Sequence, residues 1–78
     1  SDRIKRMLRI YRERQEKIGQ QMLQIEEFIN GISDPEIRQI FEMRFIEGRK
    51  LREVAGEVNL DRSSIGKKIN RYLQIMQC

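Results

Sequence analysis

The residues of this 78-residue chain best suited to chemistry are basic and hydroxyl side chains gathered near its C-terminus. Between residues 62 and 71 every charged side chain is basic, and Asp61 is the only acid among the last twenty residues. Arginine and lysine suit phosphates and guanine edges, and serine suits either. We therefore predict base or major-groove contacts with double-stranded DNA for six residues: Arg62, Ser63, Ser64, Lys67, Lys68 and Arg71. The alternative is a solvated basic face of a surface helix.

A second basic cluster consists of Arg49, Lys50 and Arg52. These residues stand at the expected start of a short helix that would cross the DNA backbone, so we assign them to phosphate contacts. Surface ion pairs with Glu47 or Glu53 are the alternative.

Catalytic chemistry finds little support in the composition. The chain has no histidine, which is the commonest general base and metal ligand, and its single cysteine is the last residue, Cys78. We expect no enzyme activity, no cofactor and no metal site, and we interpret Cys78 as a solvent-exposed terminal thiol.

Length and charge point to a small binding module. Seventy-eight residues suffice for one small domain, and no segment approaches the ~20 apolar residues of a membrane span. The net charge of +4 is uneven. Residues 1–20 carry seven basic and three acidic side chains, residues 21–58 five and eight, and the last twenty four and one. We expect a cytoplasmic protein with no membrane partner.

The elements that must position these residues are helices, because no segment shows the alternation of a strand. Residues 1–31 have a heptad pattern and predict one long amphipathic helix. Its apolar stripe is assigned to packing or dimerisation, with Ile4, Tyr11, Ile18, Ile25 and Phe28 as the residues named. Arg14 and Gln21 interrupt this stripe, and the pattern leaves the pairing orientation open.

Residues 33–77 predict three further helices. Ser33 and Glu36 have capping-box spacing ahead of a second helix that ends at Gly48. Its expected face consists of Ile37, Ile40, Phe41, Arg44 and Phe45, broadened by Met43 and Ile46.

A third helix is expected over 50–58 and a fourth over about 62–76. Asn59 suits a left-handed exit from the third helix, and Asp61 suits the N-cap of the fourth. The inward residues would be Leu51, Val54, Ala55 and Val58, then Ile65, Ile69, Tyr72 and Leu73. Two helices joined by a tight turn, the second of them basic, are typical of a helix-turn-helix unit.

Three stretches carry a resemblance to a known family: residues 34–48 (DPEIRQIFEMRFIEG), 51–55 (LREVA) and 60–65 (LDRSSI). Together they resemble the fourth conserved region of bacterial sigma factors. They are more closely similar to small phage-encoded regulators of the RinA and ArpU type. The resemblance covers about residues 33–75 and implies promoter binding through the helix that matches 62–71. The chain departs from the pattern at Lys50, where the family usually has a capping serine or threonine.

Two functional hypotheses follow. The first is a phage-type transcriptional regulator that binds duplex promoter DNA as a homodimer. The second is an assembly module, either a small-terminase-like packaging subunit or a unit that docks on RNA polymerase, which uses the N-terminal helix to associate.

Overall fold

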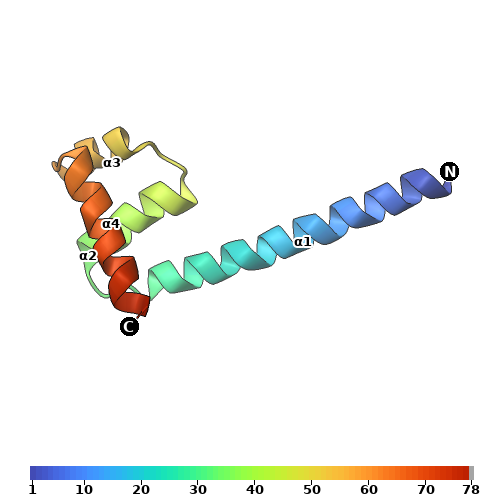
Figure 1. The fold of residues 1–78 in the computed structure, drawn as a ribbon, viewed down its shortest axis with the longest axis horizontal. Helices are drawn as coiled ribbons and strands as arrows, with labels where there is room; N and C mark the ends of the chain where they lie inside the picture. The colour runs from blue at the N-terminus through green and yellow to red at the C-terminus, as the bar shows by residue number, and fades with distance from the viewer. Residues whose placement is uncertain (78) are drawn as a thin grey trace.

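The computed structural model describes residues 1–77, so the interpretation of Cys78 lies outside the described residues. All regular secondary structure of these residues is helical and none of it is strand, which confirms the all-α fold class. The long helix α1 (Asp2–Asn30) projects from a small head formed by α2 (Pro35–Phe41), a π-helical turn (Glu42–Ile46), α3 (Leu51–Val58) and α4 (Arg62–Gln77) (Figure 1). The molecule measures 55 × 28 × 17 Å along its principal axes because this helix extends far beyond the head.

Helix α1 is continuous, as the heptad pattern predicts. The Ser1 hydroxyl accepts a hydrogen bond from the Ile4 amide at 3.4 Å, which satisfies one free donor of the first turn. At the other end, the Gly31 amide donates to the carbonyls of Glu27 and Phe28. Every side chain from residue 1 to residue 21 is exposed, so the first two thirds of the helix pack on nothing in this chain.

The start of α2 differs from the prediction by one residue. Asp34, and not Ser33, is the N-cap, and its Oδ1 accepts from the amides of Glu36 at 2.9 Å and Ile37 at 3.3 Å. Pro35 explains the difference, because its fixed φ and missing N–H suit the first helical position. The residue directly before the proline is therefore the cap.

The second helix does not run on regularly to its end at Gly48. After Phe41 it widens into a π-helical turn, which shifts the phase of the residues that follow. Met43 is buried, whereas Phe45 and Ile46, expected on the packed face, are exposed by 44% and 36%. Gly48 then ends the segment with a φ of +67°, a left-handed conformation that glycine adopts without strain.

The turn between α3 and α4 forms as expected. Asn59 has φ 58° and ψ 40° and ends α3 in the left-handed conformation. Asp61 begins α4, because its Oδ1 accepts from the Ser64 amide at 2.7 Å and from the Ser63 hydroxyl at 3.0 Å. This bond to the Ser64 amide, followed by those from serine hydroxyls, holds the pKa of the Asp61 carboxyl below its usual value.

The core joins the last turn of α1 to the head. Its buried members are Ile29, Ile32, Ile40, Phe41, Met43, Val54, Ala55, Ile65 and Ile69. Phe41 lies at the centre of an aromatic cluster, with ring centroids 5.2 Å from Phe45, 5.4 Å from Tyr72 and 6.2 Å from Phe28. Leu73 is 38% exposed, so its assignment to the inward face of α4 is wrong. It lies at the rim of the core, where no further element of the described chain covers it.

Candidate nucleic-acid interface

The six residues assigned to base contacts do not share one face of α4. Arg62, Ser63, Lys67 and Arg71 are exposed, whereas Ser64 and Lys68 are half-buried on the side that faces α2. Helical residues advance by about 100° each, so the buried Ile65 and Ile69 determine which side chains point outward. Ser63, Lys67 and Arg71 therefore point away from the core. Arg62, seven residues before Ile69, lies on the same side of the helix as that buried residue and is exposed in the first turn of α4, beside the start of α3.

Lys68 and the two serines are already engaged within the chain. The Lys68 Nζ lies 3.4 Å from Glu36 Oε1, an ion pair that connects α4 to the first turn of α2. The Ser63 hydroxyl donates to Asp61, and the Ser64 amide does the same. These contacts hold the start of α4 in place. Arg62, Lys67 and Arg71 are the exposed cations of the predicted set.

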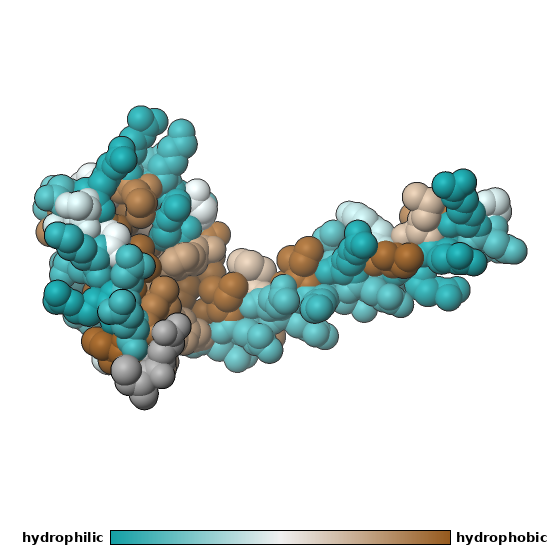
Figure 2. All heavy atoms as spheres, in the orientation of Figure 1, coloured by the Kyte–Doolittle hydropathy of each residue, from teal (hydrophilic) through white to brown (hydrophobic). Residues whose placement is uncertain are grey.

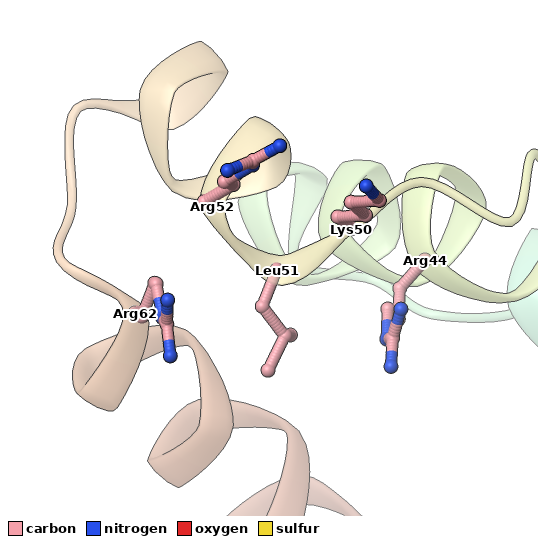
Figure 3. A pocket seen from close by; sticks show the side chains of 5 residues that line it. All are labelled: Arg44, Lys50, Leu51, Arg52 and Arg62. Carbon is pink, nitrogen blue, oxygen red and sulfur yellow. The ribbon is translucent and has the colours of Figure 1, made fainter.

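A basic pocket of about 380 Å³ lies between the π-helical turn, the start of α3 and the start of α4. It is lined by Arg44, Lys50, Leu51, Arg52 and Arg62 (Figure 3). Four of these five side chains are cationic and none is acidic. Leu51 points into the space between Arg44 and Arg62. Such a concave surface is suited to an anion that several donors contact at once.

The backbone adds to the positive character of this pocket. Lys50 is the N-cap of α3 and provides no side-chain hydrogen bond, so the first amides of α3 stay uncapped. A helix N-terminus carries a partial positive charge and favours phosphate groups. The absence of a capping serine or threonine at position 50 therefore leaves amide donors beside the cationic side chains.

Arg44 belongs to this pocket although the sequence placed it on the packed face of the second helix. Its guanidinium donates from Nη1 to the carbonyl of Arg49 at 2.9 Å, which holds the side chain beside the start of α3. An arginine among apolar residues on a helix face needs a partner, and that signal was present in the sequence. The partner itself is a backbone carbonyl, which a sequence pattern does not reveal.

Arg49, assigned to phosphates, faces carboxylates in the structure. Its guanidinium nitrogens lie 3.2 Å from Glu57, 3.6 Å from Glu53 and 3.9 Å from Glu47. The hydrogen bond to Glu57 is the main reason that the pKa of Arg49 is raised. These contacts correspond to the ion-pair alternative, with Glu57 as a partner that the sequence analysis missed. Lys50 and Arg52, in contrast, line the basic pocket.

The residues assigned to dimerisation separate into two groups. Ile4, Tyr11, Ile18 and Ile25 are exposed along α1, whereas Phe28 is half-buried and belongs to the aromatic cluster. Phe28 thus contributes to the core of its own chain. The other four leave an uncovered apolar stripe.

Within residues 1–77, no three metal-ligating side chains gather into a possible metal site, and no helix has the length and apolar character to cross a membrane. No family model, curated protein or solved structure matches this chain.

Proposed function

We propose that this chain binds double-stranded DNA as a phage-type regulator of transcription and acts as a homodimer in the cytoplasm. Helix α4 would lie in the major groove, and the basic pocket would hold a phosphate of the adjoining backbone. The observation that carries the proposal is the acid-free pocket of four cations, to which the first turn of α4 contributes Arg62.

The two surfaces would have different tasks. Lys67 and Arg71 are exposed on α4 and would contact base edges, with Arg62 at the border between base and phosphate. Arg44, Lys50 and Arg52 would contact phosphate, which fixes the position of α4 in the groove. Arg49 would make no contact with DNA and would stabilise α3 through its ion pairs with Glu53 and Glu57.

The test begins by selecting bound duplexes from a random pool and measuring their affinity over a range of salt concentrations. The double variant Lys67→Ala, Arg71→Ala should lose both affinity and sequence preference. Arg52→Ala should weaken binding to all duplexes alike. It should also lower the slope of log affinity against log salt concentration by about one, because one phosphate contact is lost. Arg6→Ala removes the same charge from the exposed part of α1 that projects from the head, residues 2–21, which we call the arm, and is the matched control. Unchanged binding in the double variant would contradict the assignment of α4.

A second candidate function is an assembly module of the packaging or polymerase-docking kind. It is favoured by the projecting α1, whose apolar side chains are uncovered over most of its length. The mass in solution separates the candidates, because a ring favours packaging and a dimer favours the regulator. Binding to RNA polymerase without any enriched duplex would favour docking.

A further inference from the structure

The surface of this chain is too large for a globular monomer of its mass. Its accessible area is 6569 Å², whereas a folded monomer of 9.4 kDa exposes about 5,000 Å². Its radius of gyration is 17.1 Å, against about 11.5 Å for a compact domain of this length. The surplus of roughly 1,500 Å² exceeds the roughly 800 Å² that each partner buries in a stable interface.

The uncovered apolar surface is continuous from the arm to the head. The stripe of α1 runs from Ile4 through Tyr11 and Ile18 to Ile25. There it meets an apolar groove of about 250 Å³ in the angle between α1 and the head, lined by Ile25, Phe28, Ile29, Phe41, Phe45 and Leu73. Figure 2 shows hydrophobic side chains along the arm and at its junction with the head. A partner that covers this surface must therefore be long and apolar on one side.

Charge along the surface changes sign between its two ends. Near the N-terminus, Leu8 lies among Lys5, Arg9 and Arg12. Beside the apolar groove, a second hollow shares Ile29 and is lined by the carboxylates of Glu26, Glu42 and Glu47. One end of the surface is thus apolar and basic, and the other is apolar and acidic. When two copies of this surface meet in opposite directions, the basic end of each lies against the acidic end of the other.

We infer that a second copy of this chain covers the surface, with the two α1 helices antiparallel and each N-terminal end seated in the groove of the other copy. Such an interface is isologous, because the same patch serves both subunits. Ile4 and Met7 then lie opposite Ile25 and Phe28 of the second copy, and they fill the gap left beside Phe45 and Leu73. The inference rests on the homodimer of the proposed function but not on its DNA contacts.

The heptad positions support the antiparallel orientation over the parallel one. Lys5, Arg12 and Glu26 are spaced by multiples of seven and lie along one side of the stripe. In an antiparallel pair, these residues of one copy face the same residues of the second copy in the opposite order, so Lys5 lies near Glu26 of the second copy. In a parallel pair Lys5 would lie level with Lys5, and the two strongly basic N-terminal segments would repel each other.

The first experiment measures mass in solution by sedimentation over a range of concentrations. We expect a dimer that Ile4→Glu dissociates into monomers of unchanged helicity, since Ile4 is exposed in the single chain. Leu23→Glu is the matched control, because Leu23 is equally exposed but lies on the opposite side of α1 from the stripe. A wild-type monomer at all concentrations, or equal effects of both variants, would overturn the inference.

The orientation is tested by charge reversal and by cross-linking. Lys5→Glu and Glu26→Lys should each weaken the dimer roughly tenfold, because each change occurs twice in a symmetric pair. The double variant should recover the wild-type affinity, and Glu27→Lys, which lies off the stripe, should have little effect. No recovery in the double variant would overturn the antiparallel register.

Cross-linking gives a second readout that does not depend on charge. In a Cys78→Ser background, a tagged Met7→Cys chain is mixed with an untagged Ile25→Cys chain and oxidised. An antiparallel pair gives mixed disulfides, whereas a parallel pair joins like positions to each other. Predominantly like-to-like products would overturn the orientation while leaving the proposed DNA binding intact.

Discussion

The head and the arm of this molecule are both helical, yet different interactions keep them so. In the head, four short elements and the last turn of α1 surround a shared apolar core, and none of these elements exceeds 16 residues. In the arm, α1 continues for about 20 exposed residues on helix propensity and its own hydrogen bonds. An amphipathic stripe on such an arm is therefore more informative about a partner than about the fold of the chain itself.

The largest effect should come from the core of the head. Ile65→Ala removes a side chain with no exposed area and should lower the free energy of unfolding by about 2–5 kcal/mol. Urea denaturation measures this loss. Ile18→Ala makes a similar chemical change on the arm, and it should leave the stability of the monomer nearly unchanged when the protein is too dilute to associate. Equal losses at both positions would break the distinction between head and arm.

A smaller effect is expected at the cap of α4, and it should depend on pH. The pKa of Asp61 is depressed in the folded chain, so its ionised carboxylate contributes stability above the ordinary carboxyl pKa, and this contribution is lost as the pH falls through the depressed value. Asparagine also caps helices but does not titrate there. The stability difference between wild type and Asp61→Asn should therefore shrink at low pH. A constant difference would contradict a role for the charge.

The left-handed turn between α3 and α4 should respond to the choice of residue. Asn59→Ala should destabilise the head by about 1 kcal/mol, because a Cβ-bearing residue without the asparagine amide is strained at φ 58°. Asn59→Gly removes that strain and should retain the wild-type stability or exceed it. Thermal unfolding of the pair measures the difference. Equal melting temperatures for the two variants would mean that the turn relaxes.

The smallest effect is expected on the arm. Gly19 is exposed, and a Cβ added there meets nothing within 4 Å. Gly19→Ala should stabilise the middle of α1 by at most about 1 kcal/mol, which amide hydrogen exchange detects residue by residue. Exchange in the head should not change. Slower exchange throughout the head would show that arm and head unfold together.

Much of the fold follows from local patterns. The long helix, the left-handed Asn59, the Asp61 cap and the all-α class all rest on residues close together in the chain, where propensity and periodicity act directly. The errors lie where two neighbouring signals compete or where a regular period is broken. Asp34 is the cap and not Ser33, and the π-helical turn exposes Phe45.

Local patterns account for only part of the candidate site. The basic segment of α4 was evident from composition, and so was the cluster at the start of α3. Which cations act together depends on the packing of separate elements. Arg44 joins Lys50 and Arg52 at one pocket, while Arg49 turns to carboxylates that lie along α3.

The sequence by itself determined the helical fold class, the roles of Asn59 and Asp61 at the ends of helices, and the places where positive charge accumulates, because these properties arise within one or two helical turns. The tertiary structure decided which of the charges are free, which are paired, and which apolar residues remain uncovered. The physical reason is distance. Lys68 meets Glu36, and Phe28 meets Tyr72, across segments that only the packed core brings together. The same packing leaves the stripe of α1 exposed and forms the groove into which a second copy would fit.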